Sequence, residues 1–181
     1  TIAATNADYA DELAWRFSDK NFRAYTSTDL IGVEVGGAVK NVLAIATGMS
    51  DGLGFGANTR VAIITRGLAE MTRLGVALGA SADTFTGLSG MGDLVLTCTD
   101  NQSRNRRMGL GLASGKTVDA VAEEIGQVVE GVKAAAAVRI VAANLGVEMP
   151  ICEQVYQILY ENASAQEAVK ILMRREVKSE D

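Results

Sequence analysis

The stretch of sequence that decides the fold reads Gly36-Gly37-Ala38-Val39-Lys40-Asn41-Val42-Leu43-Ala44-Ile45-Ala46. It is apolar and rich in small residues, and a single lysine stands in it. Asp29 is a suitable helix cap, so the sequence predicts a helix from Leu30 to about Thr47. Glycine and alanine let a neighbouring helix or a ligand approach closely. We therefore expect Lys40 on the wall of an interior or a cleft.

Two interpretations of Lys40 stand about equal on the local sequence. Burial disfavours the ammonium form of a lysine, and this is how a lysine becomes a general acid near neutral pH. Alternatively, the side chain extends from a helix end into water and has no chemical role.

Composition excludes several classes of function. There is no histidine, which removes Ser-His triads, histidine-ligated zinc and histidine acid-base chemistry. Seventeen basic and 22 acidic residues give a net charge of −5, so nucleic acid is not an expected partner. Glu34, Lys40 and the Gly36-Gly37 pair interrupt the most apolar stretch, so no membrane span is predicted. Two isolated cysteines, Cys98 and Cys152, favour a reducing cytoplasm.

The chain divides into two unequal parts. Residues 1–28 contain a predicted strand at Thr1 to Thr5, a helix capped by Asn6 and a second strand at Phe22 to Tyr25. This βαβ piece is too small for a stable sheet, and we expect it to be the C-terminal end of a larger α/β domain. Residues 29–181 are predicted to be helical throughout. The predicted fold class is mainly all-α, with a multi-helical domain preceded by the small βαβ piece.

A glycine-rich segment follows the lysine-bearing helix. Gly48-Met49-Ser50-Asp51-Gly52-Leu53-Gly54-Phe55-Gly56-Ala57-Asn58 is predicted to be a turn, with Asn58 capping the next helix. Four glycines are more than a helical hairpin requires. The turn is therefore expected to pack closely against backbone or to approach a ligand, while a tight structural connection is the alternative.

Asp93 belongs to a second glycine-rich segment, Gly87-Leu88-Ser89-Gly90-Met91-Gly92-Asp93-Leu94. An acid at a glycine-rich turn before an apolar helix is, taken alone, more typical of a helix N-cap than of a functional carboxylate. The local pattern leaves both interpretations open.

A third segment, Ser103-Arg104-Asn105-Arg106-Arg107, is the best functional signal that the residues themselves provide. Ser103 is a good cap, but cations in the first helical turn reverse the usual preference for acids there. That reversal costs stability unless an anion is bound, and free backbone N–H groups with a guanidinium form a phosphate site. A solvated basic face is the competing interpretation.

These segments together resemble the bacterial type of NAD(P)-dependent glycerol-3-phosphate dehydrogenase. The resemblance rests on three ordered motifs: Gly37-Ala38-Val39-Lys40-Asn41-Val42-Leu43-Ala44, Gly90-Met91-Gly92-Asp93-Leu94 and Ser103-Arg104-Asn105-Arg106. It extends outward to Tyr25, Asp29 and Gly32-Val33-Glu34, and to Val128-Val129-Glu130-Gly131. Three motifs in this order over about 70 residues specify the family far better than any one of them.

The resemblance implies a reaction and a role for each matched residue. The family interconverts sn-glycerol 3-phosphate and dihydroxyacetone phosphate with NAD or NADP, and supplies glycerol 3-phosphate for phospholipid synthesis. Lys40 would exchange the proton with the substrate oxygen, and Asp93 would bind substrate beside it. Ser103, Arg104 and Asn105 would hold the substrate phosphate. The cofactor would contact Arg104, Val128 and Glu130.

The same resemblance implies that residues 1–28 end a nucleotide-binding domain whose glycine-rich turn and second substrate lysine are absent from these 181 residues. We therefore expect the chain by itself to lack dehydrogenase activity and to bind substrate weakly. A related dehydrogenase acting on a 3-hydroxy acid or on 6-phosphogluconate is the nearest alternative, and a non-enzymatic helical interaction module is the alternative of another class. The oligomeric state is left open, with a homodimer as one arrangement.

Overall fold

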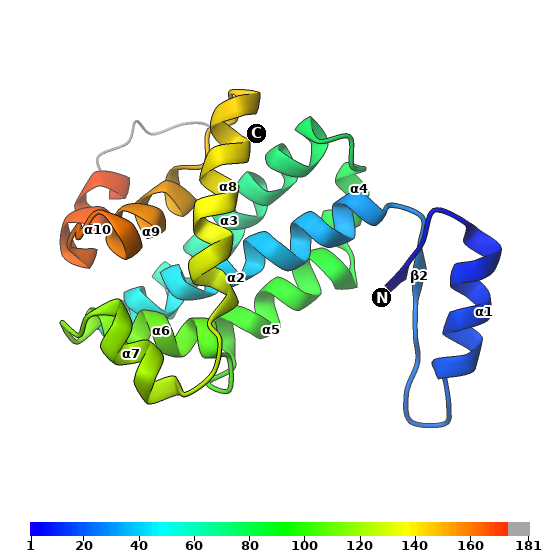
Figure 1. Ribbon diagram of the computed structural model, residues 1–181, viewed down its shortest axis with the longest axis horizontal. Coiled ribbons are helices and arrows are strands. Elements are labelled where there is room, and N and C mark those ends of the chain that lie inside the picture. Colours follow the sequence, from blue (N-terminus) through cyan, green and yellow to red (C-terminus); the bar gives the residue numbers. More distant parts are fainter. Residues whose placement is uncertain (174–181) are drawn as a thin grey trace.

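A computed structural model describes residues 1–173, and its elements are arranged as a helical body with a small N-terminal appendage (Figure 1). The elements are β1 (Ile2–Ala3), α1 (Ala7–Phe17), β2 (Thr26–Ser27), α2 (Leu30–Gly52), α3 (Ala57–Ala77), α4 (Ala82–Thr86), the π-helix η1 (Leu88–Gly92), α5 (Asp93–Thr99), α6 (Arg104–Ala113), α7 (Val118–Ile125), α8 (Glu130–Leu145), α9 (Pro150–Tyr160) and α10 (Ala165–Met173). The predicted fold class is confirmed. The last eight residues of the predicted helical domain, 174–181, lie outside the described residues.

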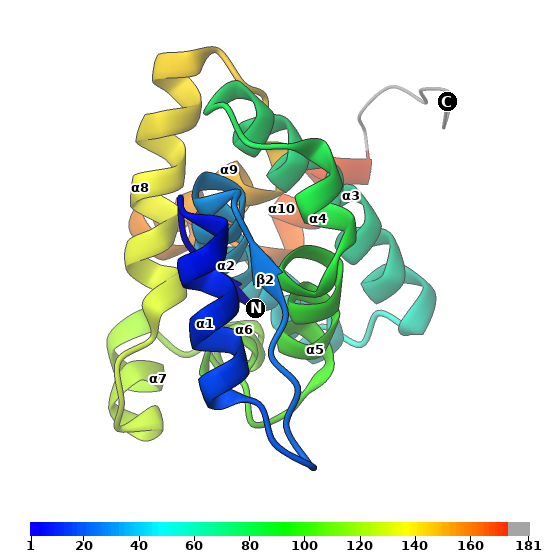
Figure 2. The same ribbon diagram turned by 90° about the vertical axis from the view of Figure 1, so that its right-hand side faces the viewer.

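Helix α2 is the axis of the helical body. Its apolar middle, including Val42, Leu43 and Ile45, is fully buried because α3, α5, α6, α8 and α9 all pack around it. Among the described residues α2 alone is long and apolar enough to cross a membrane, yet 56% of its most apolar window is buried inside the protein. That packing identifies it as the core helix of a bundle. In Figure 2, α8 lies on the left of α2 and α5 lies on the right.

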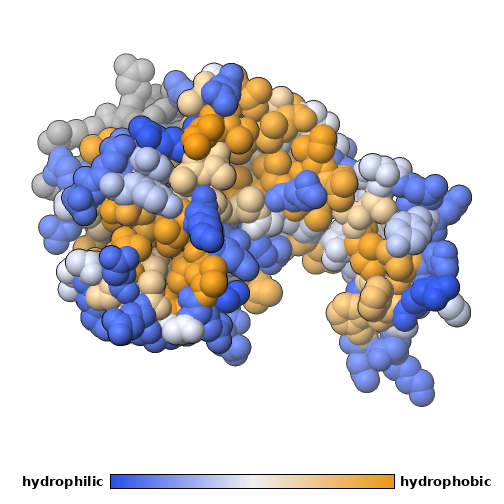
Figure 3. All heavy atoms as spheres, in the orientation of Figure 1, coloured by the Kyte–Doolittle hydropathy of each residue, from blue (hydrophilic) through white to orange (hydrophobic). Residues whose placement is uncertain are grey.

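The N-terminal piece stands away from the helical body. Strands β1 and β2 pair in parallel, with Ile2 opposite Thr26, and α1 connects them. Figure 3 shows this piece as a separate lobe that carries apolar residues on its surface. Trp15 is 80% exposed and Phe22 is 59% exposed, which is a large apolar surface for so small a unit.

The prediction of a second strand at Phe22 to Tyr25 was wrong by a few residues. The strand is Thr26–Ser27, and the preceding residues form a turn around Asp19, whose side chain accepts hydrogen bonds from the backbone of Asn21 and Phe22. The aromatic residues Phe22 and Tyr25 suggested the strand, because aromatic residues favour strands. The residues that pair with β1 are instead those that lie just before the connection to α2. The first predicted strand and its Asn6 helix cap are confirmed.

The glycine-rich turn was also placed too early, because α2 continues to Gly52. A Cβ atom at Gly48 would lie 2.1 Å from the carbonyl oxygen of Arg106, and one at Gly52 would lie 2.5 Å from the Cβ of Ala113. These two glycines therefore allow α2 to pack closely on α6. Close packing against backbone was one of the roles that the sequence predicted for this segment. The turn itself is short and contains Gly54 at φ +84°. Gly56, not Asn58, is the N-cap of α3.

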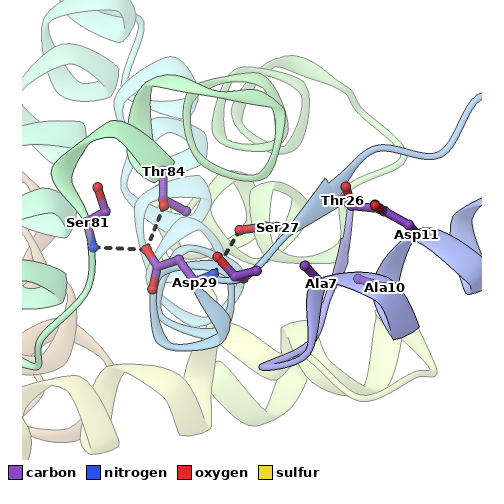
Figure 4. A pocket seen from close by; sticks show the side chains of 9 residues that line it. Ala7, Ala10, Asp11, Thr26, Ser27, Asp29, Ser81 and Thr84 are labelled. Carbon is purple, nitrogen blue, oxygen red and sulfur yellow. Dashed lines mark hydrogen bonds between the residues drawn. The ribbon is translucent and has the colours of Figure 1, made fainter.

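Asp29 fastens the start of α2 to α4 (Figure 4). Its carboxylate caps α2 by accepting the backbone N–H of Gly32 at 2.9 Å, and it also accepts from the hydroxyl of Thr84 at 2.6 Å and the N–H of Ser81 at 3.0 Å. Burial raises the pKa of Asp29, but these three hydrogen bonds outweigh it and hold the pKa below its ordinary value. Asp29 also borders a cavity of about 420 Å³ between the N-terminal piece and the body.

Candidate functional site

Lys40 and Asp93 meet between two helices. Lys40, in the middle of α2, donates a hydrogen bond from Nζ to Oδ2 of Asp93, the first residue of α5. The side chains are 20% and 37% exposed, so the ion pair is partly buried but reachable from solvent. Thr97, one turn further along α5, donates from its hydroxyl to the Asp93 backbone oxygen at 2.6 Å. Lys40 is therefore neither free in solvent nor unpaired in the core.

The path of the chain before α5 explains why Asp93 reaches Lys40. Gly36 on α2 lets η1 come close, since a Cβ there would lie 2.9 Å from the carbonyl oxygen of Ser89. Gly90 passes against the backbone of Phe85 in the same way. Asp93 is not an N-cap, because the preceding Gly92 already has helical backbone angles. Its carboxylate is thus free to turn toward α2 instead of capping its own helix.

Ser103 and Asn105 shape the start of α6. Ser103 is the N-cap, as predicted, and its Oγ accepts the backbone N–H of Arg106 at 3.3 Å. Asn105 is buried: its Nδ2 donates to Oδ1 of Asn41 at 2.9 Å, and its Oδ1 accepts the backbone N–H of Gly131 at 2.8 Å. Asn41 in turn donates to the carbonyl oxygen of Gly37. This amide chain joins α8, α6 and α2 next to Lys40.

The start of α8 contributes the remaining predicted residues. Glu130 opens α8 and lies 3.8 Å from the guanidinium of Arg104, and both side chains are exposed. Val128, two residues earlier, is also exposed. Gly131 allows α8 to approach α2, because a Cβ there would lie 2.7 Å from the carbonyl oxygen of Asn41. The N-termini of α6 and α8, each carrying partial positive charge, therefore lie together.

The space beside Lys40 is open on the N-terminal side of α2. A Cβ atom at Gly37 would meet no atom within 4 Å, and Ala38 is exposed. A ligand can therefore lie over this part of α2 within reach of Lys40. The structure brings Lys40 and Asp93 together, and it brings Asn105 and Arg104 to the α8 terminus that carries Glu130.

The sequence analysis missed the role of Asn41 and misassigned that of Arg106. Asn41 orients Asn105, and its signal was an amide directly after the lysine in an otherwise apolar helix. Arg106 was counted among the cations awaiting an anion, but its side chain is 8% exposed and pairs with Asp51 at 2.5 Å. The sequence signal for this pair was the run of cations at the start of a helix, which requires a negative partner. Asp51, in the glycine-rich segment, was an acid that could supply it. The anion argument therefore applies to Arg104 and not to Arg106.

Neither cysteine belongs to this site. Cys98 and Cys152 are free and buried. Burial raises the pKa of the Cys98 thiol to about 11 and raises that of Cys152 well above its ordinary value. Both thiols stay protonated at neutral pH and so are poor nucleophiles. The chemistry that the described residues offer is proton exchange at Lys40 and Asp93, with anion binding at the start of α6.

Comparison with known proteins shows which family the chain belongs to. The family model described as the C-terminus of NAD-dependent glycerol-3-phosphate dehydrogenase matches residues 29–170. The chain belongs to this family. A relative from Aeromonas salmonicida, glycerol-3-phosphate dehydrogenase (NAD(P)+), is 57% identical over 181 residues, and one of the same name from Aeromonas hydrophila is 58% identical. These alignments cover 99% of the chain and 54% of each relative, so the chain spans about half the length of the curated relatives it matches.

Solved structures of the family share the fold. A crystal structure of glycerol-3-phosphate dehydrogenase from Coxiella burnetii superposes with a TM-score of 0.92 at 49% sequence identity, covering 96% of this chain and 53% of that one. The enzyme from Saccharomyces cerevisiae superposes with a TM-score of 0.80 at 29% identity, covering 90% of this chain and 48% of that one. The helical arrangement around α2 is thus a property of the family.

Proposed function

We propose that the protein carrying this chain interconverts sn-glycerol 3-phosphate and dihydroxyacetone phosphate with NAD or NADP as cofactor. The observation that carries the proposal is the Lys40–Asp93 pair, which lies beside open space on α2. The next residue, Asn41, is hydrogen-bonded to Asn105 in the first turn of α6. The names of the relatives support the same reaction. Supply of glycerol 3-phosphate for phospholipid synthesis would be its role in metabolism.

Lys40 is the proposed acid and base. In reduction, its ammonium gives a proton to the carbonyl oxygen at C2 of dihydroxyacetone phosphate, and in oxidation the neutral amine takes that proton from the hydroxyl. Asp93 holds the Lys40 nitrogen in place and supplies the countercharge to the ammonium form. With both groups on packed helices, the donor is fixed before the substrate arrives, which lowers the entropic cost of alignment.

The proposed phosphate subsite is the start of α6. Ser103, Arg104 and Asn105 offer a hydroxyl, a guanidinium and an amide N–H, together with the positive end of the helix. Arg104 is held loosely by Glu130 at 3.8 Å, so it can turn to an anion without breaking a short ion pair. A phosphate there would place the three-carbon substrate along α2 toward Lys40.

The proposed cofactor edge consists of Arg104, Val128 and Glu130. These residues are exposed at the junction of α6 and α8, which suits contact with the ribose and nicotinamide portion of a dinucleotide. When bound, NAD(P) supplies or accepts the hydride. We propose further that residues 1–28 complete the nucleotide-binding domain and that residues 29–181 form the substrate domain. The parallel β1–β2 pair with its connecting helix supports this division.

A chimera tests the proposal. Residues 1–181 would replace the matching half of the Aeromonas salmonicida relative, and NAD(P)H oxidation would be followed with three substrates: dihydroxyacetone phosphate, a 3-oxo acid and 3-keto-6-phosphogluconate. We expect turnover with the first. Turnover with either of the others in preference would assign the site to a different dehydrogenase. Sedimentation of the same protein tests whether it forms a homodimer, and cell fractionation tests the predicted cytoplasmic location.

A further inference from the structure

A buried charge cluster lies near the candidate site but is not part of it. It consists of Asp51 at the end of α2, Arg60 on α3 and Arg106 on α6, and is called here the Asp51 cluster. Oδ2 of Asp51 accepts from Nη1 of Arg60 at 2.6 Å and from Nη1 of Arg106 at 2.5 Å. The Arg106 and Asp51 side chains are 8% and 13% exposed, whereas that of Arg60 is 30% exposed.

Arg106 connects α6 to two of the other helices that carry the candidate site, α2 and α5. Besides Asp51 on α2, its side chain donates from Nε to Oδ1 of Asn101 at 3.1 Å and from Nη1 to the carbonyl oxygen of Cys98 at 3.4 Å. Cys98 lies in α5, the helix that begins at Asp93, and α2 carries Lys40. Both contacts lie near the C-terminal ends of α2 and α5, away from Lys40 and Asp93, so the guanidinium holds the loop that leads into α6 against these two helix ends.

The backbone of Arg106 is held as well. Its N–H donates to Oγ of Ser103, and its carbonyl oxygen lies against Gly48 of α2. Arg106 directly follows Asn105 and Arg104, so the positions of these two residues depend on a neighbour that is anchored at both backbone and side chain. A guanidinium can make several hydrogen bonds in fixed directions at once, which a lysine ammonium cannot reproduce.

We propose that Arg106 is a positioning residue of the phosphate subsite: through Asp51, Asn101 and Cys98 it sets where Arg104 and Asn105 meet the substrate phosphate. This inference rests on the proposed function, because it assigns a cause to the geometry of that subsite. It also predicts a specific defect, namely that loss of Arg106 impairs recognition of the phosphate and spares the proton-transfer end of the site.

The test compares two substrates in the chimera described above. Arg106→Gln is expected to lower kcat/KM for dihydroxyacetone phosphate about 100-fold, since a displacement of about 1 Å has that effect, and to leave kcat/KM for dihydroxyacetone unchanged. Arg60→Gln is the matched control, because it removes a bond to the same carboxylate oxygen but belongs to α3, which carries no predicted site residue. In this control, the ratio of kcat/KM for dihydroxyacetone phosphate to kcat/KM for dihydroxyacetone is expected to equal that of the wild type.

Equal losses with both substrates, or no loss with either, would overturn the inference. Asp51 keeps Arg60 as a partner in Arg106→Gln, which limits the damage to folding. If that variant still fails to fold, Arg106→Lys provides the test, with a smaller loss expected in the same direction and the same outcomes overturning it.

A binding measurement separates this inference from the proposed function. Inorganic phosphate would be titrated into the 181-residue chain, and the amide resonances of residues 103–106 would be followed by NMR. We expect shifts in the wild type and in Arg60→Gln, and none in Arg106→Gln. Failure of the chimera to use dihydroxyacetone phosphate would refute the proposed function alone. Unchanged phosphate shifts in Arg106→Gln, or their absence in the wild type, would refute the role of Arg106.

Discussion

Helix α2 carries an ion pair at each of two positions, and the two differ in nearly every respect. Near its middle, Lys40 meets Asp93 with side chains 20% and 37% exposed, and the adjacent Gly37 faces open space. Near its end, Asp51 meets the buried Arg106 and the partly exposed Arg60, and Gly48, one turn earlier, touches the backbone of α6. One sequence pattern, a charge flanked by glycines on an apolar helix, thus occurs at the proposed ligand site in one place and at a packed junction in the other.

The difference teaches that a charge or a glycine has no fixed meaning along this helix. A glycine over open space leaves room for a ligand, whereas a glycine against backbone allows helices to touch. An ion pair at the surface contributes little to stability and stays available for chemistry, whereas a buried one is committed to the fold. Substitutions in the Lys40–Asp93 pair should therefore lower activity more than stability. Substitution of Asp51 should lower stability.

Lys40→Ala gives the largest expected effect. In the chimera, kcat should fall by about 10²–10⁴-fold, because general acid-base groups contribute that much, while KM changes little. Steady-state NAD(P)H oxidation with dihydroxyacetone phosphate measures both constants. Lys116→Ala, which removes an exposed ion pair with Glu124, is the control and should behave as the wild type. A near-normal kcat for Lys40→Ala would move the acid elsewhere.

Asp51→Ala and Asp93→Ala compare the two ion pairs directly. Removing Asp51 leaves the Arg106 guanidinium, whose side chain is 8% exposed, without its countercharge and should lower the free energy of unfolding by about 3–5 kcal/mol. Removing Asp93 should cost only about 1 kcal/mol, because its side chain is 37% exposed and water can reach the pair. Urea unfolding of the 181-residue chain gives both values. Similar losses in the two variants would show that the contrast between the pairs is not energetic.

Gly109→Ala and Gly37→Ala make the same comparison with glycines. A Cβ at Gly109 would lie 2.1 Å from the carbonyl oxygen of Ile45, so α6 must move off α2, at an expected cost of about 1–3 kcal/mol. Gly37 has room, and alanine is the better helix former, so this change should stabilise the chain by about 0.5–1 kcal/mol. Thermal unfolding decides the sign, and destabilisation by Gly37→Ala would contradict the open space beside Lys40.

Asp29→Asn tests the smallest effect and its pH dependence. The folded state lowers the pKa of Asp29, so its ionised form stabilises the protein above the ordinary pKa of an aspartate, and this stabilisation is lost as the pH falls through the lowered value. We expect the variant to be less stable by about 1 kcal/mol at neutral pH and to match the wild type in acid. Asp119→Asn, which changes an acid in the first turn of α7, is the matched control.

Local chemistry made part of this structure predictable. The Asn6 and Ser103 caps depend on neighbouring residues and were correctly predicted. Long-range packing was harder to predict. Gly48 and Gly52 indicate a turn by composition, and only the approach of α6 explains why α2 continues through them.

The candidate site shows the same division. Lys40 and Asp93 are 53 residues apart in sequence, and the resemblance, not the spacing, predicted that they lie together. Arg106 was misread because its partner Asp51 is 55 residues away and nothing local points to it. Cations that start a helix can satisfy a distant acid as readily as a ligand, and a single sequence does not distinguish the two.

The amide chain through Asn105 has a consequence for which ligands the subsite can accept. The N–H of Gly131 can only donate and the carbonyl of Gly37 can only accept, so the two backbone groups at its ends fix the orientation of both amides between them. Asn105 itself is 6% exposed, so its amide cannot flip without breaking both of these bonds. A ligand that reached this amide would meet its remaining N–H, which favours an acceptor oxygen, such as one of a phosphate, over a group that can only donate.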